Sequence, residues 1–175
     1  MAPELYDTST YDNLPCLSDA GKVFDAKNGE DMISSKFREL FLHHKVDRIF
    51  GLALLHRHFE LSPNEQLVEY RGTSVPWEYA PGAISPYIRP TNWALVQNGS
   101  FLPYEFHYSI DEGDVEFDEP GNPTYLPFLQ DFERVLHEED AVGLFGLCKY
   151  PGDNFPGRVE ITQGRANINL LPQHV

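Results

Sequence analysis

The stretch "RIFGLALLHRHFEL", residues 48–61, decides the fold that we expect for this chain. Both alternating faces of the stretch are apolar up to Leu55, which is the pattern of a strand covered on both sides. One face carries the small residues Gly51 and Ala53, so a helix can pack closely against it. The sequence therefore predicts a buried strand over residues 49–60 with a helix packed on it.

The opposite face of this stretch changes from apolar to polar along one line. It begins with large apolar side chains and ends with His56, His58 and Glu60. Side chains two residues apart on a strand point the same way. This pattern is typical of a strand that enters a pocket.

Turn residues and periodic apolar positions divide the rest of the chain. Residues 1–27 lack periodicity and are expected to form an extended N-terminal arm. Apolar residues at helical spacing predict one helix from Asn28 and another within residues 125–140. The four prolines of residues 72–91 predict a long loop. The remaining strands are expected at residues 65–71 and 141–150 and in hairpins over 92–109 and 158–171.

Asn98 and Gly99 predict a tight primed turn in the first of these hairpins. If the turn has two residues, Trp93 faces Tyr104 across the strands. The aromatic side chains on that side of the hairpin would then share one face.

A chain of 175 residues is long enough for one domain with a sizeable core. We expect residues 28–175 to form a single α+β domain after the arm. Its fold is expected to be a curved, mostly antiparallel sheet or partial barrel with two packed helices.

The composition argues against two classes of partner. The chain has 27 acidic and 13 basic residues, and its net charge of −14 repels nucleic-acid phosphates and anionic lipid. Its first 14 residues lack the basic start and apolar run of a signal peptide, and no segment has about 18 uninterrupted apolar residues. We therefore expect a cytoplasmic protein that binds neither nucleic acid nor membrane. The sequence is compatible with a homodimer.

His56 and His58 allow three interpretations. On a strand they lie about 6.6 Å apart, which suits joint coordination of a metal ion, as in cupin barrels. Glu60 or Glu65 would then supply a carboxylate and His107 a third imidazole, although the spacing to Glu65 departs from the cupin motif. The pair can instead work as a metal-free acid and base, or the two rings can be hydrogen-bonded strand histidines without a function.

A second tier of candidate catalytic residues comprises Glu60, Glu69 and His107. His107 shares a predicted strand face with Glu105, and a carboxylate beside a neutral imidazole can hold it in one tautomer as a base. The chain has no Gly-x-Ser-x-Gly motif, and its stretches "GLALLHR", residues 51–57, and "GLFGLC", residues 143–148, are expected to be strands instead of phosphate-binding turns. We therefore expect an enzyme without a cofactor.

Aromatic residues are abundant, with 12 Phe, 9 Tyr and 2 Trp in the chain. Such side chains bury large areas and line pockets for apolar ligands, although each of them can also be ordinary core. Those expected to wall a cavity for an apolar small-molecule substrate are Trp77, Tyr79, Trp93, Tyr104, Phe106, Tyr108 and Tyr70.

The stretches "LLHRHFELSPNEQLVEYRGTSVPW", residues 54–77, and "GRANINLLP", residues 164–172, carry a resemblance. The chain resembles a family of small, mostly uncharacterised fungal proteins with a His-Arg-His-Phe strand, over most of its length from about residue 30. It is also similar to cofactor-free cyclases of fungal natural-product pathways, including the norbornene-forming Diels–Alder type. What carries over is the histidine strand, without an assigned role.

Together these observations predict a small cofactor-independent enzyme of fungal secondary metabolism. It would enclose an apolar metabolite in an aromatic pocket and catalyse an isomerisation, a cyclisation, pericyclic ones included, or an elimination. His56, His58 or a tyrosine would polarise a carbonyl. One alternative is a metal-dependent, cupin-like enzyme that uses the same histidines. The other is a non-enzymatic ligand- or protein-binding domain, in which the acidic segment 111–119 engages a basic partner or the cavity carries a ligand.

Overall fold

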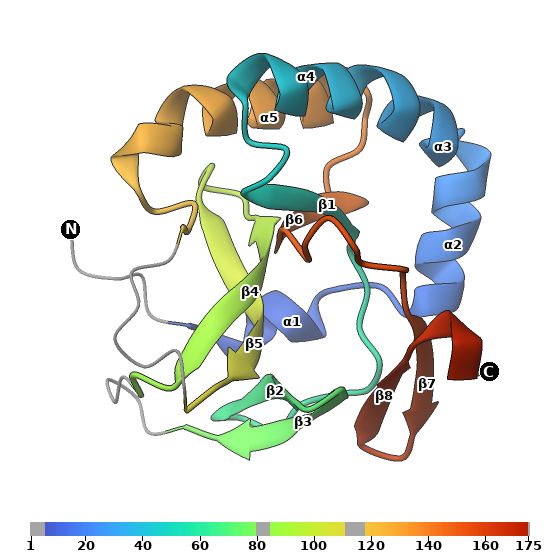
Figure 1. Ribbon diagram of the computed structural model, residues 1–175, viewed down its shortest axis with the longest axis vertical. Helices are drawn as coiled ribbons and strands as arrows, with labels where there is room; N and C mark the ends of the chain where they lie inside the picture. The colour runs from blue at the N-terminus through green and yellow to red at the C-terminus, as the bar shows by residue number, and fades with distance from the viewer. Residues whose placement is uncertain (1–5, 80–84, 111–117, 175) are drawn as a thin grey trace.

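The computed structural model describes residues 6–79, 85–110 and 118–174 and confirms the α+β fold class. Eight strands of this described chain form one curled sheet, shaped like half of a barrel (Figure 1). Their order is β1-β6-β4-β5-β2-β3-β8-β7, and neighbours are antiparallel except β2 and β5. The strands are β1 (Phe50–Leu54), β2 (Glu65–Tyr70), β3 (Thr73–Glu78), β4 (Ile88–Leu95), β5 (Phe101–Tyr108), β6 (Phe145–Lys149), β7 (Val159–Gln163) and β8 (Ala166–Leu170).

Two long helical segments lie side by side over the β1–β6 end of the sheet (Figure 1). The first is the helix expected from Asn28, and it runs without a break through three parts. These are α3 (Gly29–Met32), the π-helical turn η1 (Ile33–Phe37) and α4 (Arg38–His44). The second is α5 (Leu126–Glu138), which follows the short η2 (Pro123–Tyr125). A last short turn, η3 (Pro172–His174), follows β8.

The N-terminal segment is helical where the structure describes it, and the expected extended arm is wrong there. It contains α1 (Thr8–Asp12) and α2 (Leu17–Ala26). The side chain of Asp7 caps α1 by accepting a hydrogen bond from the N–H of Ser9. A five-residue helix is too short for apolar periodicity to reveal it, and its stability comes from packing.

The main core lies between α4, α5 and the adjoining end of the sheet. Six of its buried side chains are phenylalanines, namely Phe37, Phe41, Phe50, Phe128, Phe132 and Phe145. A second core joins Tyr11 to Leu55, Leu61, Leu67 and Tyr104. The linker between β1 and β2, which carries the histidines, is therefore anchored in this second core at both of its ends.

The units α4–β1 and α5–β6 repeat one backbone conformation. Each helix is followed by a left-handed residue, Lys45 at φ 57° or Asp140 at φ 49°. The next residue, Val46 or Ala141, then donates its N–H to a carbonyl of the last helical turn at 3.0 or 2.7 Å. Both strands begin with Phe-Gly-Leu, and they pair antiparallel with each other.

β1 ends at Leu54, short of the strand expected to residue 60, because its partner β6 begins opposite it at Phe145. Beyond this point the chain leaves the sheet and follows the N-terminal segment, where Arg57 forms an isolated bridge to Cys16. The two histidines therefore lie on an irregular linker and not on a strand.

The hairpin register also differs from the expected one. Leu95 faces Phe101, so the turn is a three-residue loop and Trp93 faces Pro103 instead of Tyr104. Gly99, at φ 81°, supplies the left-handed residue that such a loop requires.

β3 lies within the stretch that was expected to be a long loop. Among the described residues, β8 pairs with β3 at Thr73 and Ser74, which leaves the rest of β3 at an edge of the sheet. Pro76 follows these two residues, and a proline at an edge costs no ladder hydrogen bond.

Candidate functional site

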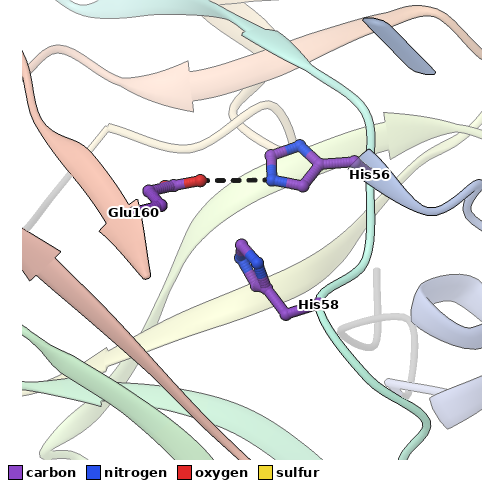
Figure 2. A group of neighbouring side chains, drawn as sticks. All are labelled: His56, His58 and Glu160. Atoms are coloured by element: carbon purple, nitrogen blue, oxygen red, sulfur yellow. Dashed lines mark hydrogen bonds and ion pairs between the residues drawn. The ribbon is translucent and has the colours of Figure 1, made fainter. Parts of the chain in front are cut away.

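His56 and His58 point toward the inside of the half-barrel, where they meet Glu160 of β7 (Figure 2). Their side chains are 14% and 4% exposed. The ring centroids lie 4.8 Å apart and the ring planes cross at 87°. Both imidazoles can therefore reach one small molecule, and neither lies in bulk solvent.

The hydrogen bonds of His56 define where its protons lie. Nδ1 is 2.9 Å from the carbonyl of Leu54, and because a carbonyl oxygen can only accept, Nδ1 carries a proton. Nε2 is 3.2 Å from Oε2 of Glu160, so a second proton is shared in this pair. Burial opposes a charge on the ring, but the bonds to Glu160 and Leu54 outweigh it and raise the pKa of His56. The hydrogen bond between His56 and Glu160 lowers the pKa of the Glu160 carboxyl, so the two side chains form an imidazolium–carboxylate pair.

His58 is held in the opposite protonation state. Burial, together with the positive charge of His56, lowers the pKa of His58 to about 4. The Nδ1 atom of its ring lies 3.4 Å from Oγ1 of Thr162. Its backbone N–H donates to the hydroxyl of Tyr11 at 2.9 Å. A neutral imidazole thus stands beside a charged one.

Glu105 on β5 is a further ionisable group at the site. Its Oε1 lies 4.0 Å from Nε2 of His58. The β4–β5 ladder shifts register on both sides of Asn92, which faces Glu105, and such bulges re-aim side chains. Burial raises the pKa of Glu105 to about 7, although the charge of His56 opposes this rise. Near neutral pH this carboxyl can both hold and release a proton.

Glu160 is absent from the candidates that the sequence predicted. It lies 104 residues after His56, in the closing hairpin. The alternation of β7 puts Glu160 and Thr162 on one face, and this is the signal that the sequence does contain. No sequence rule states that the last hairpin folds against the linker that carries the histidines.

The structure brings His107 and Glu69 together as a separate pair. Nδ1 of His107 is 2.5 Å from Oε2 of Glu69, and the two residues face each other across β5 and β2. His107 follows Glu105 by two residues on β5, so the pair lies on the same face of the sheet as the site. These second-tier residues border the His56–His58 cluster, and no direct contact joins the two groups in the described chain.

Glu60 and Glu65 lie apart from the two imidazoles. The Glu60 side chain is 81% exposed and its carboxylate is 3.5 Å from Arg57. Glu65 pairs instead with Arg165. The carboxylate beside the histidines is Glu160, so the structure differs from the cupin-like arrangement that the sequence left open.

The aromatic residues expected to bind substrate fall into three groups, and none of them has a ring contact with His56 or His58 in the described chain. Trp93 and Tyr104 are buried in the two cores. Phe106 and Tyr79 pack around Tyr6. Trp77, Tyr70 and Tyr108 form a cluster on β2, β3 and β5.

Three side chains of the site can also hold a metal ion. His56, His58 and Glu160 each offer one ligand atom, and these atoms lie within 4.8 Å of one another. Two imidazoles and a carboxylate suit zinc or ferrous iron. The bond from Nδ1 of His56 to the Leu54 carbonyl is a contact that metal-bound histidines usually make.

No family model matches this chain, and neither a curated protein nor a solved structure matches it. Among the described residues, no helix combines the length and the apolar character needed to cross a bilayer. Most of the acidic segment 111–119, considered above as a contact for a basic partner, lies outside the described residues.

Proposed function

We propose that this protein is a cytoplasmic, cofactor-independent enzyme that moves a proton on an apolar metabolite, in an isomerisation, a cyclisation or an elimination. The observation that carries the proposal is geometric: the His56 ring, bonded to Glu160 at 3.2 Å and to the Leu54 carbonyl at 2.9 Å, lies 4.8 Å from the ring of His58, and these surroundings favour a charged His56 beside a neutral His58. Proton transfer requires an acid and a base in one place, and environments that push two groups into opposite protonation states provide them. The resemblance of residues 54–77 to fungal proteins makes secondary metabolism the setting that we propose.

The two rings would act at neighbouring atoms of the substrate. The proton shared by His56 and Glu160 passes to a carbonyl oxygen as negative charge develops there. Neutral His58 removes a proton from the adjacent carbon, and Glu105, 4.0 Å away, stabilises the charge that His58 gains. The resulting enol returns its hydroxyl proton to the His56–Glu160 pair. Reprotonation at another carbon by His58 gives an isomer, and departure of a leaving group that takes the His58 proton gives an alkene.

Nitrogen-15 NMR of the imidazoles tests the basis of this proposal. At pH 7 we expect His56 to show two protonated ring nitrogens and His58 to show one. Equal protonation of the two rings would remove the acid–base assignment.

Hydrogen exchange into a panel of apolar ketones tests the activity itself. In D2O the protein should speed the replacement of protons next to the carbonyl, followed by proton NMR. His58→Gln should slow this exchange about 100-fold or more, as expected for loss of a general base. The exposed His137 is the matched control, and His137→Gln should keep the full rate. A folded His58→Gln variant with the wild-type rate would contradict the role of His58.

A metal-dependent enzyme is a second candidate, because the ligand atoms of His56, His58 and Glu160 lie within 4.8 Å of one another. Titration calorimetry with Zn²⁺, Mn²⁺ and Fe²⁺, on protein without a histidine tag, separates the two candidates. Stoichiometric binding that His56→Gln and Glu160→Gln abolish and His137→Gln retains would favour the metal. Absence of stoichiometric binding would remove this candidate.

A further inference from the structure

A depression with a volume of about 180 Å³ lies between β2, β8 and the segment that precedes β7. Its polar lining includes Glu69, Arg158 and Asn169, and its apolar lining is Phe155, Leu170 and Leu171. A volume of this size equals that of roughly six water molecules in the liquid. It has room for a carboxylate group and a short apolar chain.

The strand register places this depression beside the histidine cluster. Asn169 in its lining faces Glu160 directly across β8 and β7. Glu69 faces His107, which is two residues from Glu105 on β5. Residues that face each other, or that lie two apart on one strand, share a face of the sheet. Asn169 and Glu69 of the lining therefore lie on the same face of the sheet as Glu160 and Glu105.

Arg158 is an exposed cation of this depression. Within residues 6–79, 85–110 and 118–174 it has no close ion pair, its guanidinium lies over the ring of Phe155, 5.3 Å from the centroid, and its charge helps to lower the pKa of Glu160 from a distance. The carboxylates of Glu69 and Glu160 each have a histidine partner already. An arginine whose guanidinium is not held by a carboxylate in a close ion pair keeps its donors available for an anion.

The charge of Arg158 also reaches the site. Burial raises the pKa of Glu105, and the guanidinium of Arg158 is one of the groups that oppose this rise. An anion bound to Arg158 would therefore lie within electrostatic range of Glu105 and of the histidines beside it.

We propose that Arg158 binds a carboxylate of the substrate, so that the enzyme acts on an apolar carboxylic acid. This inference rests on the proposed function, because it assumes that the carbon chain of the bound acid reaches His56 and His58. The planar guanidinium can hold both carboxylate oxygens at once. Phe155, Leu170 and Leu171 provide an apolar lining for the first carbons of the chain.

Octanoate and its uncharged analogue octanamide test this site with known probes. In ¹H–¹⁵N NMR titrations, octanoate should shift the side-chain Nε–H signal of Arg158 and the backbone signals of Asn169 and of Gly72, which also lines the depression. Octanamide should bind about tenfold more weakly or not at all, because it lacks the charge-assisted bonds. Arg158→Gln should weaken octanoate binding about tenfold, and Arg158→Lys should retain part of it. The control Arg38→Gln changes an arginine on α4 and should bind octanoate like the wild type.

The outcomes separate this inference from the proposed function. Equal binding of octanoate to wild type and Arg158→Gln, or no binding at all, would overturn the carboxylate site while the ketone-exchange experiment is unaffected. Octanoate binding that depends on Arg158, combined with ketone exchange that does not depend on His58, would support the carboxylate site and contradict the proposed function.

Discussion

His58 and Glu105 illustrate how two buried groups shape the pH dependence of stability. The folded-state pKa of His58 is about 4, against 6.5 ordinarily, so the unfolded chain binds more protons between these values and stability falls as the pH falls. The folded-state pKa of Glu105 is about 7, against 4.5 ordinarily, so the folded protein binds more protons and stability falls as the pH rises. Each slope reaches about 1.4 kcal/mol per pH unit, and the two largely cancel between pH 4.5 and 6.5.

When one of the two groups is removed, the unfolding free energy should show the pH dependence that the other group causes. From pH 6.5 to pH 5, we expect the unfolding free energy of Glu105→Gln to fall by about 1.5 kcal/mol relative to wild type. His58→Gln should change in the opposite direction, gaining stability relative to wild type over the same range. Urea unfolding at several pH values measures both. Curves that stay parallel to that of the wild type would show that the two groups titrate normally.

Tyr11 is a positioning residue for His58. Its hydroxyl accepts the backbone N–H of His58 at 2.9 Å, and its side chain is fully buried. Tyr11→Phe leaves that N–H without a partner and should lower the unfolding free energy by about 1–3 kcal/mol. It should also shift the imidazole NMR signals of His58. Tyr6→Phe, which loses a bond to the carbonyl of Glu65 at 3.2 Å, is the matched control and should leave those imidazole signals unchanged.

At the scale of elements, the sequence predicts the helices and strands that apolar periodicity encodes. It misses strand ends and sheet edges, which depend on the neighbouring strands. α5 and β6 lie where their patterns predicted them, because both bury one continuous apolar surface. β1 is shorter than predicted because its partner β6 begins opposite Leu54, and this pairing belongs to the tertiary structure. β3 was missed because its proline sits at a sheet edge, and whether a strand lies at an edge depends on the topology.

The repeated helix ends allow a matched prediction at this scale. Lys45 and Asp140 both adopt positive φ after their helices, where glycine is favoured. Lys45→Gly should raise the unfolding free energy by about 0.5–1 kcal/mol, since relief of the left-handed strain exceeds the added chain entropy. Asp140→Gly should raise the unfolding free energy by less, because this variant loses the ion pair with Lys27 at 2.5 Å. Lys45→Ala is the control, and a gain equal to that of glycine would show that backbone strain is not the cause.

At the scale of the whole molecule, the site forms because the half-barrel is closed by side chains. The sheet ends at β1 on one side and at β7 on the other, and the linker after β1 meets β7 through His56 and Glu160. The histidine pair could be predicted from the sequence, since its spacing and the apolar run before it are local. Its partners Glu160 and Glu105 could not, because they come from distant strands that the topology brings together.

Arg165 supplies a second link in this closure and carries the last prediction. In the turn between β7 and β8, its Nη1 lies 3.2 Å from the Glu65 carboxylate, and its Nη2 lies 3.4 Å from the Glu60 carbonyl. Because the pair is partly exposed and screened by solvent, its loss should destabilise the protein only slightly and open the hairpin locally without unfolding the core. Arg165→Gln should therefore speed amide hydrogen exchange in β7 and β8 about fivefold, leave β1 and β6 unchanged, and shift the His56 imidazole signals.

Arg134→Gln, which breaks an exposed pair on α5, is the control and should leave exchange in β7 and β8 as it is in the wild type. If β7 exchanges equally slowly in Arg165→Gln, backbone pairing with β8 alone holds the hairpin in place. The charged state of His56 would then depend on β7 being rigid in itself and not on closure of the half-barrel by side chains.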